Sequence, residues 1–346
     1  YDVDHAQGRW IIHTNADGAV DFKLMTSTAE LPSRETWEPW VDHLPGRYIV
    51  GFAAFAGHVA RLERVDALNR IIVTAADGAE HSIDFDEEAY SLHLEGSLEY
   101  ATTTLRFTYQ SMTTPRQTFD YDMAARTRVL RKTQEIPSGH DPARYVTKRL
   151  QATASDGQSV PIPVLMLKDT PLDGRAPLLV YGYGSYGHPQ DAAFSIRNLS
   201  LVDRGWIWAL AHTRGGTDKG YGWFLDGKKF AKKNTFSDFV PCAEEFISPG
   251  YGRAGHIVCE GRSAGGLLMG AINNMRPDLW AGVIGGVPFV DVLNTMSDTS
   301  LPLTPPEWPE WGNPLESVEA YDYIASYCPY SNIERKAYPA LLATGG

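Results

Sequence analysis

Cysteine is scarce in this sequence, and long apolar segments are missing. Three cysteines occur in 346 residues, an odd number at wide spacing, so the chain has neither a disulfide framework nor a zinc-binding pattern. No run reaches the ~18 apolar residues that a membrane-spanning helix needs. We therefore expect a protein of a reducing compartment, in the cytoplasm. A periplasmic location stays open, because the chain begins at Tyr1 and would not show a native leader.

Clusters of positive charge are also missing. The sequence has 31 basic and 42 acidic residues, which gives a net charge of -11 at pH 7. Because nucleic acids are bound through basic surfaces, this balance argues against a nucleic-acid partner. We find no motif for a metal or a cofactor and expect neither. With 43% hydrophobic residues the chain is globular, and its length predicts two domains.

The first part of the chain, residues 1–136, reads as antiparallel strands. Its segments alternate between apolar and polar residues, and no helix of convincing length interrupts them. The pairs Asp17-Gly18 and Asp77-Gly78 are typical of two-residue hairpin turns. Such spacing suits propeller blades or a β-sandwich, and the length is enough for about three blades of four strands. Residues 137–150 are rich in Pro, Gly and Asp at their start and predict a linker.

The second part, residues 151–346, predicts strands that alternate with helices, as in a mainly parallel sheet flanked by helices. The runs 176–184 and 205–216 are almost continuously apolar, as expected for strands buried on both faces. Residues 256–261, 282–289 and 338–346 supply further strands. A helix is predicted over 235–247, with Pro241 tolerable only if the helix begins close to it.

The segment Gly-Arg-Ser-Ala-Gly at 261–265 lies between a predicted buried strand and a predicted helix over 263–276. This is the setting of a nucleophile elbow, in which the flanking glycines allow a very tight turn. Ser263 would then be exposed above the sheet, and the amide of Ala264 would face an oxyanion. The alternative is a glycine-rich turn in which Ser263 only caps the helix.

A tyrosine cluster, Tyr181, Tyr183 and Tyr186, follows the strand that should neighbour this elbow. Hydrolases with a nucleophile elbow place their second oxyanion donor there. The hydroxyl of Tyr183 could supply that hydrogen bond. The alternative is that all three tyrosines are packing residues at the end of a strand.

At this point the sequence resembles the serine peptidases of the prolyl oligopeptidase family, and within them oligopeptidase B. The similar segments include LVYGYGSYG, TRGG, GKKFAKKNTFSDF, GRSAGGLLMG, VPFVDVLNTM and EWGNP, with QSMTTP in the first part of the chain. The resemblance implies an α/β-hydrolase domain preceded by part of a β-propeller. In the family the propeller excludes folded proteins, so the implied substrates are short peptides.

The resemblance also implies site residues. Ser263 matches the nucleophile, and the Ala264 amide and the Tyr183 hydroxyl match the oxyanion hole. Glu307 matches the carboxylate that receives a basic P1 side chain, with Trp308 in the same pocket, because a buried guanidinium or ammonium needs an opposite charge. The alternative for the segment PPEWPEW is a proline-stiffened loop with solvated glutamates.

Two departures from the pattern of oligopeptidase B bear on specificity. Pro309 stands where a second acid is usual, and of an upstream pair of acids only Asp191 is present, with Ala193 in the other place. Fewer carboxylates predict a weaker hold on basic P1 and P2 side chains. We therefore expect cleavage after Arg or Lys with relaxed specificity.

The sequence does not supply a complete catalytic triad. Hydrolases of this type place the acid and the histidine after the serine, and no histidine follows Ser263. His188, His212 and His256 precede it and are expected to be structural. Asp291 follows it, where we expect a carboxylate that caps the next helix.

The resemblance implies a catalytic Asp and His beyond Gly346. We therefore expect the 346-residue chain to be almost inactive by itself and the full-length protein to be a peptidase that works through an acyl-enzyme. Two alternatives remain open: an esterase or acylaminoacyl peptidase on the same fold, or an inactive propeller-based binding protein. The oligomeric state is not predicted.

Overall fold

The computed structural model describes residues 1–96 and 99–345, which form two compact units. The first unit contains residues 1–142, 191–195 and 219–222, and the second contains residues 143–190, 196–218 and the chain from Trp223 onward. Residues 97–98, in the expected propeller, and Gly346, in the expected last strand, lie outside the described residues.

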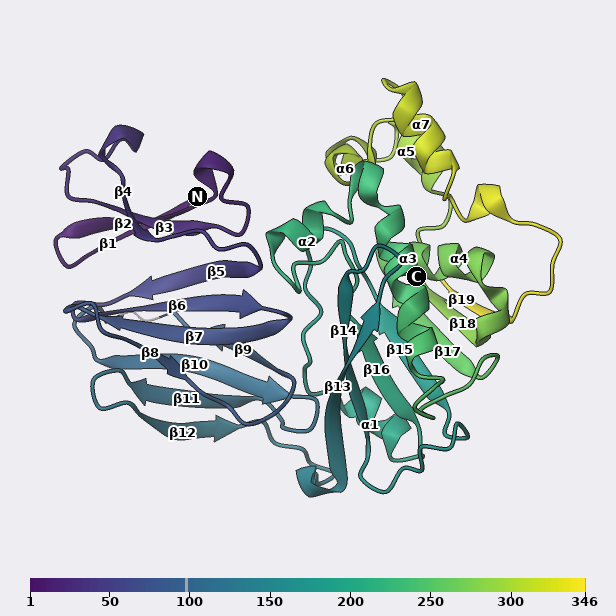
Figure 1. Ribbon diagram of the computed structural model, residues 1–346, viewed down its shortest axis with the longest axis horizontal. Coiled ribbons are helices and arrows are strands. Elements are labelled where there is room, and N and C mark those ends of the chain that lie inside the picture. Colours follow the sequence, from purple (N-terminus) through teal and green to yellow (C-terminus); the bar gives the residue numbers. More distant parts are fainter. Residues whose placement is uncertain (97–98, 346) are drawn as a thin grey trace. The chain divides into compact units, whose positions relative to one another are not determined.

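In the first unit, the described residues form three antiparallel sheets of four strands, which follow one another along the sequence (Figure 1, purple to blue). Each sheet is a meander, so that every strand pairs with its neighbour in sequence. This is the architecture of propeller blades. The strands are β1 (Asp2–Ala6), β2 (Arg9–Thr14), β3 (Lys23–Ser27) and β4 (Glu38–Val41); β5 (Arg47–Ala54), β6 (His58–Val65), β7 (Leu68–Ala75) and β8 (Glu80–Ile83); and β9 (Tyr90–Leu94), β10 (Thr104–Ser111), β11 (Gln117–Asp122) and β12 (Thr127–Thr133).

Alternation along these strands places apolar side chains between successive sheets. Ile71 and Val73 of β7, Leu92 of β9 and Phe107 of β10 are buried in one cluster between the second and third sheets. Ile11 of β2 lies in a separate cluster that joins the first sheet to the second. The strand period of two thus supplies each blade with an apolar face that the next blade covers.

The expected hairpin turns differ in length from the prediction. Asp17 and Gly18 do adopt positive φ, 59° and 75°, but they lie inside a longer loop that joins β2 to β3 and contains the short 3-10 helix η1 (Ala16–Gly18). Gly78 also has positive φ, 87°, within a four-residue connection between β7 and β8. The positive φ expected of the two Asp-Gly pairs is thus found at Asp17, Gly18 and Gly78 but not at Asp77, and the two-residue loop length was wrong.

The second unit contains a seven-stranded sheet in the order β13-β14-β16-β15-β17-β18-β19. β13 and β14 form an antiparallel hairpin, β14 is antiparallel to β16, and the remaining neighbours are parallel. Residues 145–150, which the sequence places in a linker, form the first part of β13. The strands are β13 (Tyr145–Thr153), β14 (Ser159–Leu167), β15 (Leu178–Gly182), β16 (Ile207–Ala211), β17 (Ile257–Arg262), β18 (Trp280–Gly286) and β19 (Ala340–Thr344).

Helices follow the parallel strands, and α3 and α4 pack side by side over the sheet (Figure 1). The α-helices are α1 (Ile196–Val202), α2 (Tyr221–Leu225), α3 (Lys233–Glu245), α4 (Ala264–Met275), α5 (Val292–Ser297), α6 (Thr304–Trp311) and α7 (Val318–Ala325). The other 3-10 turns are η2 (Arg34–Thr36), η3 (Pro142–Arg144), η4 (Lys229–Ala231), η5 (Pro277–Leu279) and η6 (Tyr330–Asn332).

Pro241 lies well inside α3 rather than near its start, which corrects the prediction. Proline lacks the N–H that would bind the carbonyl of Ser237, so the helix loses one hydrogen bond there. Both neighbours, Val240 and Cys242, are buried in the core. Burial of this apolar face sustains the helix through the proline.

The core of the second unit lies between the sheet and its helices. Phe239 and Phe246 of α3, Leu267 of α4 and Ile257 of β17 are fully buried there. The three cysteines, Cys242, Cys259 and Cys328, are free and buried. Among residues 1–96 and 99–345, no helix is both long and apolar enough to cross a membrane.

Candidate active site

Ser263 occupies a strained turn between β17 and α4. Its backbone angles are φ 56° and ψ -116°, a region that L-residues rarely adopt. Backbone hydrogen bonds tie the turn to the end of β18 and the segment after it: Ser263 N–H donates to the Gly286 carbonyl at 2.9 Å, and Phe289 N–H donates to the Ser263 carbonyl at 3.1 Å. The side chain is exposed and makes no capping bond to the helix, so the alternative of a purely capping serine is wrong.

The glycines around Ser263 are required by close backbone packing. A Cβ at Gly261 would collide with the Gly265 carbonyl, and a Cβ at Gly265 would lie 2.7 Å from the Gly182 carbonyl oxygen. The elbow therefore rests directly against the end of β15. This contact brings the residue after Gly182, Tyr183, next to the first turn of α4.

The ring of Tyr183 lies over this first turn, since its Cδ2 atom is 3.3 Å from the position of a Cβ on Gly265. The side chain is half-buried, and burial is the main cause that raises the pKa of its phenol. The hydroxyl is therefore protonated at neutral pH and able to donate a hydrogen bond. The Ala264 amide lies at the N-terminus of α4, where backbone N–H groups have no intrahelical partner.

A cavity of about 310 Å³ opens beside Ser263. Its wall is largely apolar and has one carboxylate, that of Glu307. Such a cavity suits a long aliphatic side chain with a positive end. The lining residues are Tyr186, Ser263, Phe289, Thr295, Met296, Leu301, Pro302, Leu303, Thr304 and Glu307.

Two donors hold the carboxylate of Glu307. The Tyr186 hydroxyl donates to Oε2 at 2.9 Å, and the Trp311 indole donates to the same oxygen at 3.1 Å. Within residues 1–96 and 99–345, no hydrogen bond uses the other oxygen, Oε1. The carboxylate is thus fixed through one oxygen, while the second stays available to a ligand.

The segment PPEWPEW is not the solvated loop that the sequence left open. It forms α6, with Pro305 and Pro306 in the first helical turn, where proline is tolerated. Glu307 is half-buried and Glu310 is buried. The indole of Trp308 packs against the core and donates to the Met296 carbonyl at 3.1 Å. Met296 lines the cavity, whereas Trp308 is not among its lining residues.

Asp191, expected among the substrate-binding residues, belongs to the first unit. Its carboxylate lies 3.2 Å from Nε2 of His93 and 3.9 Å from Nη2 of Arg64. These partners show that Asp191 sits among basic groups of the propeller strands. Ala193 lies in the same short segment.

Within residues 1–96 and 99–345, no histidine hydrogen-bonds to Ser263, but His188 packs edge-on against the ring of Tyr183, with the ring centroids 5.8 Å apart. His212 is buried, and its Nε2 lies 2.7 Å from the Gln190 carbonyl. His256 precedes β17, at the end of that strand remote from Ser263. Asp291 stands at the N-cap position of α5 without a side-chain capping bond, and its Oδ2 accepts from the Asn294 amide at 3.1 Å instead. The expected cap was therefore wrong.

Sequence reasoning missed Lys232 and Glu310. Lys232 is completely buried, and its Nζ donates to the Gly184 carbonyl at 2.7 Å and to the Ser185 hydroxyl at 3.0 Å. Glu310 accepts from the Tyr186 N–H at 2.9 Å. The sequence did contain a signal for the lysine: it directly precedes α3 and stands four and seven residues before the buried Phe236 and Phe239, in register with the buried face of that helix.

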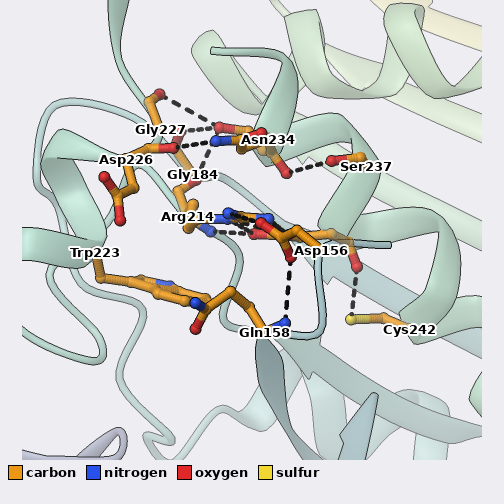
Figure 2. A network of polar contacts seen from close by, with 12 residues as sticks. Asp156, Gln158, Gly184, Arg214, Trp223, Asp226, Gly227, Asn234, Ser237 and Cys242 are labelled. Carbon is orange, nitrogen blue, oxygen red and sulfur yellow. Dashed lines mark hydrogen bonds and ion pairs between the residues drawn. The ribbon is translucent and has the colours of Figure 1, made fainter. Parts of the chain in front are cut away.

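A network of polar contacts joins α3 to two loops of the sheet, the one after β16 and the one between β13 and β14 (Figure 2). The guanidinium of Arg214 binds both carboxylate oxygens of Asp238 in α3, and its Nη1 contacts Asp156 at 2.5 Å. The Thr235 hydroxyl donates to the Arg214 carbonyl at 2.8 Å. These contacts hold the loop after β16 against the first half of α3, next to the turn at Gly184.

Comparison with family models gives two matches. The model of the prolyl oligopeptidase family matches residues 192–346, and the model of its N-terminal β-propeller domain matches residues 1–134. The chain belongs to the prolyl oligopeptidase family. The fold class is the one that the sequence predicted, part of a β-propeller followed by an α/β-hydrolase domain.

Prolyl oligopeptidase relatives match the chain from end to end. Dipeptidyl aminopeptidase BI of Pseudoxanthomonas mexicana is 44% identical over 100% of this chain and 48% of its own length. Protease 2 of Moraxella lacunata is 36% identical over 100% of this chain and 49% of its own length. The structure of oligopeptidase B from Leishmania major has a TM-score of 0.91 and 39% identity over 99% of this chain and 49% of that one. The chain thus spans about half the length of the relatives it matches.

Proposed function

We propose that the protein carrying this chain is a serine peptidase that cleaves short peptides after Arg or Lys, with relaxed specificity, through an acyl-enzyme on Ser263. The observation that supports it is the exposed, strained Ser263 beside a cavity with a single carboxylate. Membership of the prolyl oligopeptidase family supports the reaction class, and the family's propeller supports short peptides as substrates. The free, buried cysteines are compatible with a cytoplasmic location.

In this mechanism Oγ of Ser263 attacks the scissile carbonyl carbon, whose oxygen becomes an oxyanion. The Ala264 N–H and the Tyr183 hydroxyl donate hydrogen bonds to that oxygen. The C–N bond then breaks, and the amine product leaves with the proton that Oγ gave up. Water hydrolyses the ester on Ser263, which releases the carboxylic acid product and returns a proton to Oγ. A general base must accept the Oγ proton, and no side chain within residues 1–96 and 99–345 hydrogen-bonds to Ser263. The tests therefore use the natural protein at full length.

Labelling tests the nucleophile. An organophosphonate should add to Ser263 of the natural protein, detected by the mass of the peptide that contains residue 263, and Ser263→Ala should abolish the label. Ser297→Ala, in α5, is the matched control, because its hydroxyl donates to the Leu293 carbonyl within the helix. Labelling that persists in Ser263→Ala would exclude the proposed nucleophile.

Substrates that differ at P1 test the role of Glu307. A charge-assisted hydrogen bond contributes roughly 1.5–3 kcal/mol, so Glu307→Gln should lower kcat/KM for an Arg peptide about 10- to 100-fold. The same peptide with Ala at P1 should be affected little. Equal kcat/KM for Arg and Ala in the wild type would remove Glu307 from this role.

A second candidate function is release of dipeptides from N-termini. It is favoured by the 44% identity to a protein named dipeptidyl aminopeptidase BI. A chromogenic dipeptide with a free α-amino group and its acetylated form separate the two functions. Cleavage of both forms indicates an oligopeptidase, whereas cleavage of the free form alone indicates a dipeptidyl aminopeptidase.

A further inference from the structure

The turn Gly184–Tyr186 connects the two halves of the candidate site. Tyr183, whose hydroxyl is assigned to the oxyanion, directly precedes it. Tyr186, at its other end, binds the carboxylate of Glu307 through its hydroxyl. Gly184 adopts its φ of 69° without strain, but Tyr186 has a φ of 60°, which residues other than glycine rarely adopt, so the turn does not take this shape by intrinsic preference. Contacts from outside must therefore fix it.

The buried ion pair of Lys232 and Glu310 supplies these contacts. Nζ of Lys232 binds the Gly184 carbonyl and the Ser185 hydroxyl, while Oε1 of Glu310 accepts from the Tyr186 N–H. Nζ of Lys232 and Oε1 of Glu310 are 3.9 Å apart. Three consecutive residues of the turn are thus held by the two members of one pair.

Burial of the pair Lys232–Glu310 costs desolvation free energy, so the stability of the fold does not by itself explain why the pair is there. Burial lowers the pKa of Lys232 to about 7 and raises the pKa of Glu310, because both side chains have left water. Lys232 comes from the segment just before α3, and Glu310 from α6. Apolar side chains of similar volume would fill this space without the desolvation penalty. The hydrogen bonds to the turn are what such side chains could not reproduce.

We propose that Lys232 and Glu310 are positioning residues that fix the turn Gly184–Tyr186, and so aim the Tyr183 hydroxyl at the oxyanion and Glu307 at a basic P1 side chain. This inference rests on the proposed function. It assigns neither residue a contact with the substrate; both act through the turn.

The test replaces the pair by apolar side chains in the full-length natural protein. The double variant Lys232→Met/Glu310→Met should have a midpoint of urea unfolding no lower than that of the wild type. Its kcat should nevertheless fall at least ~10-fold, since misplacing a group by 1 Å can lower a rate on the order of 100-fold. Lys233→Met is the matched control, because it removes the same charge from the next, exposed residue.

Two readouts separate positioning from a general structural role. The inhibition constant of benzamidine, a probe of the cavity at Glu307, should rise in the double variant. In addition, kcat/KM should fall more for an Arg peptide than for an Ala peptide, because only the former needs Glu307. A folded double variant with wild-type kcat and wild-type benzamidine binding would overturn the proposal.

A milder variant keeps the test decisive if the double variant does not fold. Ser185→Ala removes one contact of Lys232 and leaves both charges in place. It should lower kcat about 2- to 5-fold, because the Tyr183 hydroxyl would still donate to the oxyanion, but with poorer alignment. Unchanged kcat in Ser185→Ala, together with an unfolded double variant, would assign the pair to folding only.

Failure of the proposed function has a different signature. If the wild type is not labelled at Ser263 by an organophosphonate, the peptidase assignment fails. If the wild type is labelled and the folded double variant is labelled at the same rate, the peptidase assignment stands and the positioning role fails.

Discussion

At the scale of single residues, the geometry of the site depends on one strained serine. A non-glycine residue in a sparsely populated region of φ and ψ costs roughly 1–3 kcal/mol, and Ser263 lies in such a region. The surrounding packing imposes the strain, since Gly261, Gly265 and Gly182 meet backbone to backbone. Exposure of the hydroxyl is the result of this packing.

Gly265→Ala should disturb the elbow. The added Cβ would lie 2.7 Å from the Gly182 carbonyl oxygen, and overpacking of this kind costs about 1–3 kcal/mol. We expect a lower midpoint of urea unfolding and slower labelling of Ser263. Gly282→Ala in β18 is the control, because its nearest atom lies at 3.6 Å, an ordinary contact. Equal effects of the two substitutions would contradict the packing account.

At the scale of elements, α3 is the helix that organises the site. The residue just before it holds the turn at Gly184, and Asp238 in its middle binds the loop after β16 through Arg214 (Figure 2). The carboxylate of Asp238 is completely buried, whereas the second partner of Arg214, Asp156, is 46% exposed. Asp238 is therefore the anchor of the network, and Asp156 is peripheral to it.

Asp238→Asn should be strongly destabilising. Removing one member of a buried ion pair leaves the other charge uncompensated and costs about 3–5 kcal/mol. Asp156→Asn should cost ~1 kcal/mol or less, because the exposed carboxylate is screened by water. Urea unfolding of both variants measures the difference. A smaller loss for Asp238→Asn than for Asp156→Asn would refute the ranking.

At the scale of the whole molecule, the hydrolase sheet presents an apolar edge. β19 is the last strand in the order of the sheet, and all of its residues are exposed. Leu341 and Leu342 are 62% and 55% exposed. β19 pairs with β18 on one side only, and within residues 1–96 and 99–345 no strand covers its outer edge. An open apolar strand edge is a template for association with another chain, so the 346-residue chain should self-associate at high concentration.

Leu342→Lys should reduce this association several-fold, because a charge at a sheet edge opposes strand pairing. Sedimentation velocity over a range of concentrations measures it. Leu315→Lys is the matched control: Leu315 is also 55% exposed, lies outside the strands and gives the same change in net charge. If both variants associate equally, the edge of β19 is not the site of contact.

Several features of the protein were predictable because their causes are local. The alternating period of the first part predicted antiparallel strands, and the apolar runs before 263 predicted buried parallel strands. The spacing of Gly261, Ser263 and Gly265 predicted the tight turn, because only glycine tolerates that backbone approach. By contrast, the loop length at Asp17 and the position of Pro241 depended on neighbouring packing, and both predictions were wrong.

The sequence by itself determined the order of strands and helices, the elbow and the residue types of the candidate site, since periodicity and glycine spacing act over a few residues. Only the tertiary structure decided that Lys232 and Glu310 meet at the turn before Tyr186, and that Tyr186 and Trp311 hold Glu307. These residues are far apart along the chain, and ion pairing in a buried space depends on which elements the sheet brings together. No local sequence pattern predicts that Lys232 and Glu310 are in contact.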